Sequence, residues 1–297
     1  MRKIAVINFK GGVGKTTITW LLGKYVSQSL KKRVLLFDID AQMSLTQALT
    51  LNDNDGSIDR DFWDWLLTCE GKEKTICNAW QSFINGAMRF NDFDVDNNFI
   101  YTGLSSPNLH FVPAVEELYL EAIIGTIKPK DIKDTNLFIT QTVYKIERSK
   151  VLKPYDYIFF DCPPSVSSLS FSVLFCADML LIPINPDFYA VRGLALLLNS
   201  VLSKLKDKGM LGRFPAIAVL MNKAKPWTNT FTKETKRYFA NAKNQAGHFS
   251  RKNTVKIKCI ESFLKEDASI KNVFRDDITV DIIKQMDKIW REMEELF

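Results

Sequence analysis

Glycines, lysines and threonines are concentrated in one short segment near the N-terminus. Lys10–Thr17 reads Lys-Gly-Gly-Val-Gly-Lys-Thr-Thr. Glycines let successive backbone N–H groups curl around a phosphate, and a helix that begins directly after such a loop adds the partial positive charge of its N-terminus. In such a loop we expect Lys15 to reach the β- and γ-phosphates, Thr16 to ligate Mg²⁺ and Thr17 to bind the α-phosphate. The residues expected to surround the phosphates are Lys10, Gly11, Gly12, Val13, Gly14, Lys15, Thr16 and Thr17.

Three aspartates stand at the ends of apolar runs. Asp38 and Asp40 come at the end of the run that begins at Val34, and Asp161 ends the run Tyr157–Phe160. A carboxylate at the C-terminal end of a parallel strand points into the crevice where such sheets bind ligands. We therefore expect Asp161 to reach Mg²⁺ through water, as the acid of a Walker B strand does, and the other two aspartates to border the same site.

Apolar runs that alternate with helical stretches must position these groups. Apolar, β-rich runs occur at Lys3–Phe9, Val34–Phe37, Tyr157–Phe160, Met179–Ile184 and Ile217–Met221, with weaker candidates at Leu109–Pro113 and Val255–Ile260. Thr16–Leu30 instead has its apolar residues at helical spacing. Near-continuous apolar strands separated by helices predict an α/β fold with one doubly wound, mostly parallel sheet and helices on both faces.

The expected organisation is one domain over residues 1–297 with two unusual parts. From about 52 to 106 the strand pattern gives way to acidic, Asn-rich sequence in which Trp63, Trp65 and Trp80 suit short helices, so we predict a helical insertion. Residues 199–258 hold 14 lysines and arginines against two acids, although the whole chain has a formal charge of only +6. This concentration of positive charge favours a polyanionic partner, although some of these side chains simply solvate helix faces.

The glycine-rich loop resembles that of the ParA/MinD family of deviant Walker ATPases. A strict P-loop has glycine where this chain has Phe9, whereas the family carries an additional lysine, here Lys10. Asp38–Gln42 is similar to the family's DxDPQ switch, with alanine in place of proline, and Asp161–Ser165 resembles its DCPPS segment. Leu220–Lys223 resembles the strand end that recognises the base. The resemblance extends over residues 2–50 and 107–225.

The resemblance implies a P-loop ATPase with ATP and Mg²⁺ as ligands, which forms a nucleotide-sandwich homodimer. In such a dimer Lys10 reaches the partner's phosphates, so that Lys10 and Lys15 both serve catalysis. Asp40 orients or activates the attacking water, while Asp38 holds the surroundings of Mg²⁺, and which of the two matters more stays open. Asn222 is expected to hydrogen-bond adenine, although a strand-end asparagine also serves as a cap or turn former.

Phe9 before the signature lysine looks more like the partition branch of the family than like MinD. That branch implies non-specific DNA binding and the positioning or segregation of a cargo, which is a plasmid, a chromosome or a protein organelle such as a carboxysome. A ParB-like or other cargo adaptor stimulates hydrolysis, and the protein is cytoplasmic and nucleoid-associated. We expect the DNA contacts among basic residues away from strand cores: Lys204, Lys206, Lys208, Lys233, Lys236, Arg237, Arg251 and Lys252.

Two alternatives stay open. A MinD-like membrane ATPase needs a basic amphipathic C-terminal helix; Asp281–Phe297 is amphipathic but carries three cations against five acids, so we expect it to dock on the domain and expect no membrane partner. An ATP-dependent ligase related to dethiobiotin synthetase is disfavoured by Lys10 and by the basic segment. The sequence shows no secretory signal, and no stretch approaches the roughly 18 apolar residues of a spanning helix.

Overall fold

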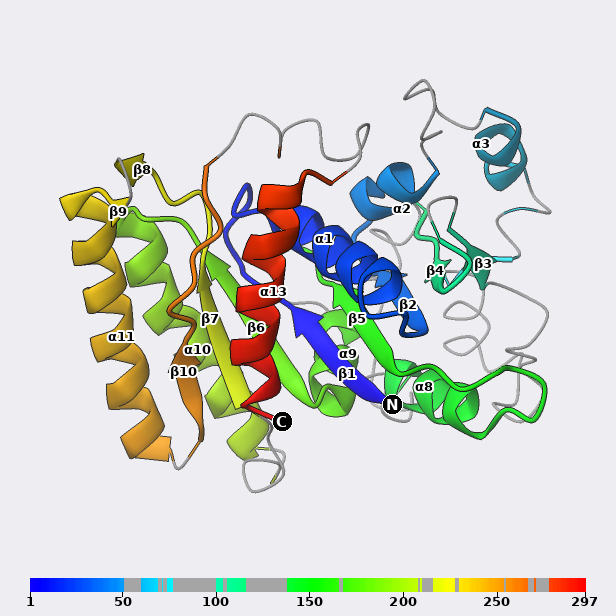
Figure 1. Ribbon diagram of the computed structural model, residues 1–297. Helices are drawn as coiled ribbons and strands as arrows, with labels where there is room; N and C mark the ends of the chain where they lie inside the picture. The colour runs from blue at the N-terminus through cyan, green and yellow to red at the C-terminus, as the bar shows by residue number, and fades with distance from the viewer. Residues whose placement is uncertain are drawn as a thin grey trace.

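Eight strands form one sheet in the computed structural model, and its strands run parallel except at one edge (Figure 1). The structure describes residues 1–50, 60–68, 71, 74–76, 100–103, 106–115, 138–165, 168–207, 209, 216–227, 230–253, 255–266, 270 and 278–297. In spatial order the strands are β10 (Ile257–Cys259), β7 (Ala216–Met221), β6 (Met179–Ile184), β1 (Arg2–Val6), β5 (Tyr157–Asp161), β2 (Val34–Asp38), β4 (Leu109–Val112) and β3 (Tyr101–Thr102).

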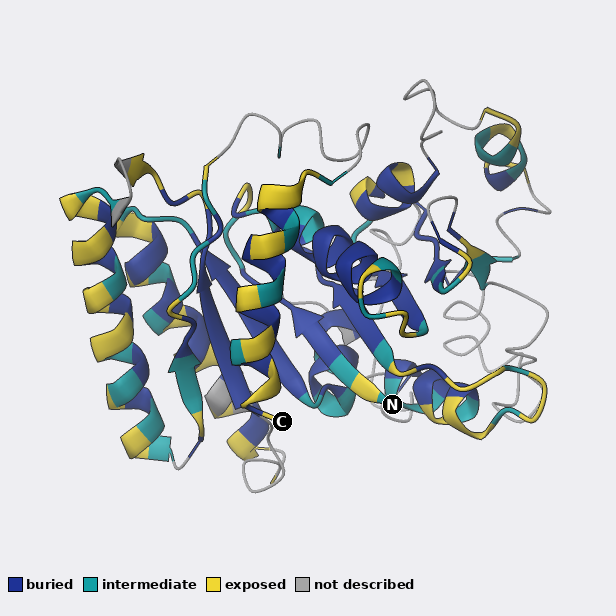
Figure 2. Ribbon diagram, in the orientation of Figure 1, coloured by how far each residue is buried: buried dark blue, intermediate teal, exposed yellow. Residues whose placement is uncertain are grey.

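Helices cover both faces of the sheet, and side chains alternate between the two resulting cores. Ile4 and Val6 point to the face that carries α1 (Lys15–Gln28), α2 (Ser44–Leu49) and α13 (Val280–Glu294). Ala5 points to the opposite face. That face carries α8 (Phe138–Arg148), α9 (Ser168–Cys176), α10 (Phe188–Asp207) and α11 (Lys233–Asn253). The sheet between these layers is almost wholly buried (Figure 2), as the predicted doubly wound fold requires.

The chain order places a switch point at β1. From β1 the chain passes through α1 to β2 on one side, and it later enters β6 on the other side, with β5 inserted between β1 and β2. In open parallel sheets, ligands bind outside the carboxyl ends of the strands at such a point. The register puts Val6, Asp38 and Asp161 level at that edge, so the loop after β1 and both strand-end aspartates meet there.

All seven predicted strands and the first predicted helix are present, so the fold prediction is confirmed. Two short elements were not predicted: β3, which pairs antiparallel with β4, and the hairpin of β8 (Pro226–Trp227) and β9 (Thr230–Phe231). Strands of two residues carry too little alternation to be detected in a sequence.

The predicted helical insertion is described only in part. α3 (Arg60–Leu66) contains two of the three tryptophans, and the Trp63 indole N–H donates to the Thr50 hydroxyl at 2.8 Å. The Phe62 ring meets the edge strand at Tyr101, with 5.5 Å between ring centroids. Most of 52–106, including Trp80, lies outside the described residues.

Two helices bear on the membrane prediction. The apolar face of α13 is buried through Ile282, Met286, Ile289, Trp290 and Met293, which confirms that this helix docks on the domain. The expectation that no stretch approaches the length of a membrane-spanning helix was wrong. Within the part of the chain that the structure describes, α10 is long and apolar enough to cross a membrane, by length and composition alone. Its apolar residues include Leu194, Leu198 and Val201, which are buried in the core of the sheet's second face, and this packing accounts for its composition.

Candidate nucleotide-binding site

The loop after β1 turns tightly through two glycines in the left-handed region. Gly12 has φ +71° and Gly14 has φ +86°, a conformation that favours glycine because it has no Cβ. Gly14 also caps α1, and a Cβ on it would collide with the amide nitrogen of Asn222. α1 therefore begins at Lys15 with the backbone N–H groups of its first turn free of intrahelical partners, as an anion site requires.

Asn8 anchors the start of this loop and was missed by the sequence reasoning. Its side-chain nitrogen donates to the Pro183 carbonyl oxygen at 2.7 Å, and its oxygen accepts from the Lys10 N–H at 2.9 Å. Asn8 is buried between β1 and β6. The one available signal was a polar residue near the end of an apolar run.

Lys15 lies buried at the base of the loop. Its ammonium nitrogen is 3.5 Å from the Lys10 carbonyl oxygen. Burial lowers the pKa of Lys15, and the nearby carboxylates of Asp161 and Asp40 oppose that shift only in part. A buried cation with few partners of its own is suited to bind an anion that enters the loop.

Thr16 and Asp161 form a pair that fits Mg²⁺. The Thr16 hydroxyl donates to one Asp161 carboxylate oxygen at 2.6 Å, and the other oxygen is buried without a partner among the described residues. Burial, and then the charge of Asp38, raise the pKa of Asp161 well above its usual range. Mg²⁺ prefers hard oxygen donors, and an orphaned buried carboxylate oxygen beside a hydroxyl offers them.

Asp38 is fully buried and its oxygens are already engaged. One oxygen accepts from both the backbone N–H and the hydroxyl of Thr46, each at 2.8 Å, and the other accepts from the Asp40 N–H at 3.1 Å. Burial raises the pKa of Asp38 to about 7 despite these hydrogen bonds. The Thr46 hydroxyl also accepts from the Ala114 N–H at 3.0 Å. Asp38 thus ties α2 and the chain after β4 to the end of β2.

Asp40 lies at the rim of the site, in the loop between β2 and α2. It is half-buried, and its carboxylate accepts from the Gln42 N–H at 3.0 Å. Met43, in the left-handed region at φ +56°, is the N-cap residue of α2 directly after this loop. The structure brings Asp40 close enough to influence Lys15 and Asp161 electrostatically, whereas its role toward water stays a prediction.

The signature lysine, Lys10, forms an ion pair with an aspartate outside the phosphate loop. Its ammonium nitrogen contacts both carboxylate oxygens of Asp187, at 3.0 and 3.1 Å, and the two side chains are 41% and 38% exposed. Asp187 also accepts from the Ala190 N–H at 2.7 Å in the first turn of α10. Lys10 is therefore held at the outer rim of the loop by the N-terminus of α10.

Asn222 and Lys223 close over the loop from the end of β7. The Asn222 amide nitrogen donates to the Val13 carbonyl oxygen at 2.7 Å, and its oxygen accepts from the Lys223 N–H at 2.8 Å. The Lys223 ammonium donates to the Gly12 carbonyl oxygen at 2.9 Å. Adenine recognition by Asn222 stays a prediction, and it would use the amide hydrogen that these contacts leave free.

Comparison with known proteins identifies the family. A family model described as an AAA domain matches residues 1–210. Soj of Bacillus subtilis, a sporulation initiation inhibitor protein, is 30% identical over 239 residues, which cover 80% of this chain and 79% of Soj. This chain belongs to the ParA family of deviant Walker ATPases. A ParA family protein of Chlamydia trachomatis is 33% identical over 194 residues, which cover 65% of this chain and 62% of that protein.

Solved structures share the fold of this ParA family member at low sequence identity. The ATP complex of Cyanothece McdA has a TM-score of 0.71 at 19% identity and covers 99% of this chain and 96% of its own. A putative plasmid partition protein of Borrelia burgdorferi, bound to AMPPNP, has a TM-score of 0.69 at 20% identity and covers 100% and 99%. A cobyrinic acid a,c-diamide synthase of Mycobacterium smegmatis reaches 0.65 at 16%, covering 99% and 96%. These likenesses show the fold alone.

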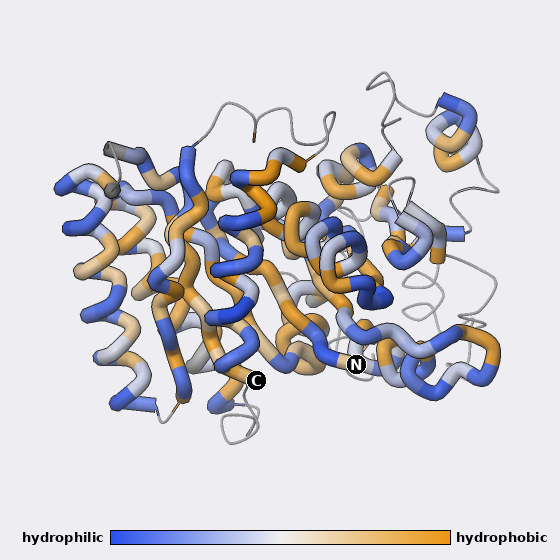
Figure 3. The backbone as a smooth tube through the Cα atoms, viewed as in Figure 1, coloured by the Kyte–Doolittle hydropathy of each residue, from blue (hydrophilic) through white to orange (hydrophobic). Residues whose placement is uncertain are grey.

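The predicted DNA-contacting residues are concentrated on α11. Figure 3 shows hydrophilic segments along the length of this helix. Lys233, Lys236 and Arg237 are exposed in its first turns, and Arg251 and Lys252 in its last. At about 1.5 Å per residue the two groups stand about 25 Å apart. Lys206 is exposed on α10, whereas Lys208 and the side chain of Lys204 lie outside the described residues.

Proposed function

We propose that this chain is a ParA-type ATPase whose ATP-bound form is a sandwich homodimer. The observation that carries the proposal is the placement of the two loop lysines. Lys15 already occupies the base of the phosphate loop, while Lys10 lies at the rim in an exposed ion pair with Asp187. An ordinary phosphate loop needs one lysine. A second lysine turned outward is suited to the phosphates of a partner subunit.

We assign each group of the site a task in ATP hydrolysis to ADP and phosphate. Lys15 and the N-terminus of α1 bind and orient the phosphates, and Thr16 and Asp161 hold Mg²⁺, which spreads the charge of the phosphates when bound. Asp40, on the loop before α2, positions the attacking water. Asp38 acts through Asp40 and Thr46, because its own oxygens are engaged with them.

DNA binding is the second part of the proposal. The exposed cations of α11 contact phosphates without reading bases, so affinity is independent of sequence and falls by roughly 0.9 log unit per log unit of salt for each phosphate neutralised on duplex DNA. A dimer doubles the contacts, and the affinity of two linked surfaces exceeds that of one. ATP thereby controls DNA binding without touching DNA.

The cargo is a plasmid, a chromosome or a protein organelle, and an adaptor bound to it stimulates hydrolysis. Support comes from family membership and from the fold shared with McdA and with a putative plasmid partition protein. On this account the protein works in the cytoplasm on the nucleoid. The packed apolar face of α13 disfavours the membrane-bound alternative, because that face is not available to lipid. The presence of Lys10, the family's additional lysine, disfavours the alternative that the chain is an ATP-dependent ligase.

Calorimetry and DNA retention test the proposal together. Lys15→Ala and Thr16→Ala should each lose ATP–Mg²⁺ binding, and undiminished ATP affinity in either variant would contradict the assigned site.

Lys236→Glu with Arg237→Glu should abolish ATP-dependent retention of random-sequence duplex DNA while leaving dimerisation intact. The matched control is Lys150→Glu with Lys153→Glu, an exposed pair before β5. Equal loss of DNA retention in both pairs would mean that only net charge matters and that α11 is not the contact surface.

A further inference from the structure

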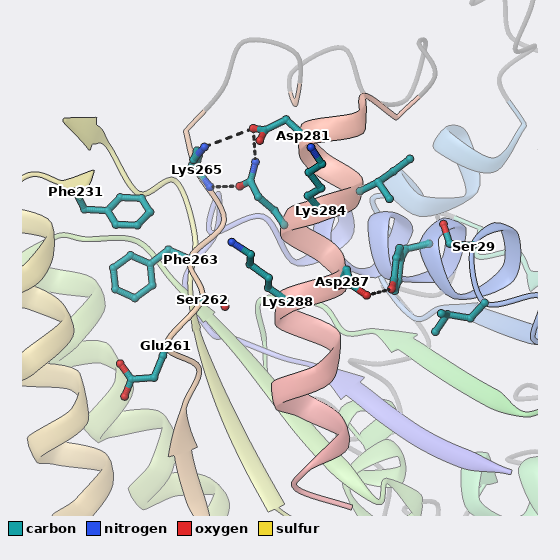
Figure 4. A pocket seen from close by; sticks show the side chains of 14 residues that line it. Ser29, Phe231, Glu261, Ser262, Phe263, Lys265, Asp281, Lys284, Asp287 and Lys288 are labelled. Carbon is teal, nitrogen blue, oxygen red and sulfur yellow. Dashed lines mark hydrogen bonds and ion pairs between the residues drawn. The ribbon is translucent and has the colours of Figure 1, made fainter. Parts of the chain in front are cut away.

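A groove lies between α13, the end of α1 and the segment Glu261–Lys265 that follows β10 (Figure 4). Its volume is about 830 Å³, within the range of protein sites that hold ligands. None of its lining residues belongs to the phosphate loop or to the carboxylates of the nucleotide site. The groove is therefore a separate feature of the molecule.

The acids that line the groove already have partners. Glu261 pairs with Lys243 outside the groove. Asp281 accepts from the Gln285 side-chain nitrogen at 2.9 Å and lies 3.5 Å from the Lys265 ammonium. Asp287 accepts from the Tyr25 hydroxyl at 2.9 Å and pairs with Arg291 at 3.0 Å. The negative charge of the groove is thus largely compensated.

Two lysines of α13 also line the groove. Lys284 and Lys288 are exposed one turn apart on α13, and neither has an acidic partner in the described part of the chain. Residues four apart on a helix stand about 6 Å from each other on the same face. The pair therefore presents two long, flexible cationic side chains on one face of α13, where two carboxylates of one short segment can meet them.

An aromatic wall faces these lysines. The Phe263 ring lies 4.7 Å from the Phe231 ring and 4.6 Å from the Phe239 ring, measured between centroids, and all three residues are only partly buried. Figure 4 shows Phe231 and Phe263 on one side of the groove and α13 on the other, with Lys288 extending toward the rings and Lys284 directed along the helix toward Asp281. An apolar side chain that enters between them gains contact with the rings while its neighbours reach the lysines.

The mixture of groups favours a peptide over duplex DNA. The convex surface of a duplex does not enter a hollow, whereas a single extended chain does. An extended peptide offers carboxylates to the lysines, N–H donors to the remaining lone pairs of the acids that line the groove, and an apolar side chain to Phe263. We propose that this groove binds a short acidic segment of a partner protein that carries an aromatic or branched apolar residue. The proposal goes beyond the nucleotide cycle and does not depend on it.

Selection from a displayed library of random 12-residue peptides tests the proposal on the full chain without nucleotide. The unaltered chain should enrich peptides with at least two acids next to an aromatic or branched residue. A synthetic copy of the most enriched peptide should bind about tenfold more weakly to the Lys284→Glu, Lys288→Glu variant, since two exposed ion pairs become repulsive. Binding should be unchanged in the Lys150→Glu, Lys153→Glu control and should weaken with salt.

A second variant guards against a folding effect of the reversed charges. Lys284→Ala with Lys288→Ala keeps good helix formers on α13, and the affinity for the same peptide should fall about threefold at an unchanged melting temperature. Three results would overturn the proposal: no enrichment over the charge-reversed variant, enrichment of peptides without acids, or retention of a 20-base-pair duplex that is lost in the same variants. The last result would assign the groove to DNA.

Discussion

Removing the hydroxyl of Thr46 should weaken the contacts that fix Asp38 and the neighbouring loop that carries Asp40. Thr46 is fully buried on α2, and its hydroxyl donates to Asp38 and accepts from the Ala114 N–H. Thr46→Val preserves the shape of the side chain but removes both hydrogen bonds. A buried N–H left without an acceptor costs about 1–3 kcal/mol, and the lost hydrogen bond to a carboxyl group adds about 1 kcal/mol or more. We expect the free energy of unfolding to fall by about 3 kcal/mol.

Thr46→Ser is the matched control, because it keeps the hydroxyl and removes only a methyl group, at a cost of about 1 kcal/mol. Urea unfolding followed by tryptophan fluorescence measures both variants against the parent at equal denaturant slope. The valine variant should also hydrolyse ATP more slowly, since α2 and the loop that carries Asp40 are no longer fixed to Asp38. If Thr46→Val is as stable as Thr46→Ser, the hydroxyl does not organise the switch and the reasoning fails.

Three further outcomes follow from the site. Asp38 has a folded pKa of about 7 against an ordinary 3.8, so the folded state binds its proton more tightly than the unfolded state. The free energy of unfolding, measured with chelator and without nucleotide, should therefore fall by up to about 4 kcal/mol between pH 4 and 7. Asp38→Asn should flatten this dependence of stability on pH. An unchanged dependence in that variant would show that Asp38 does not cause it. Asp187→Asn keeps the cap on α10 but removes the ion pair to Lys10, so ATP-dependent dimerisation should tighten about two- to fivefold. A dimer constant equal to the parent's would show that the pair does not restrain Lys10. Asp40→Ala should bind ATP normally but release phosphate slowly, and normal steady-state release contradicts its role.

The phosphate loop was predictable because its chemistry is local. Residues 10–17 are contiguous, and the strand before them and the helix after them leave strong periodic patterns. The same reasoning placed Asp38 and Asp161 at strand ends, and the register of β2 with β5 brings them level.

The contacts that complete the site join distant parts of the chain. Asn8 meets Pro183, Lys10 meets Asp187, and Lys223 meets Gly12 across separations of 175, 177 and 211 residues. No pattern within one segment encodes such pairs, since each depends on which strands become neighbours in the sheet.

Sedimentation of the chain with a slowly hydrolysed ATP analogue and Mg²⁺ tests the central claim, that Lys10 serves a partner subunit rather than its own phosphate loop. The unaltered chain should sediment as a dimer with the analogue and as a monomer without it. Lys10→Ala should remain a monomer while binding the nucleotide with the parent's affinity, because Lys15 still occupies the base of the loop. A Lys10→Ala protein that dimerises like the parent, or one that loses nucleotide binding as a monomer, would contradict the account.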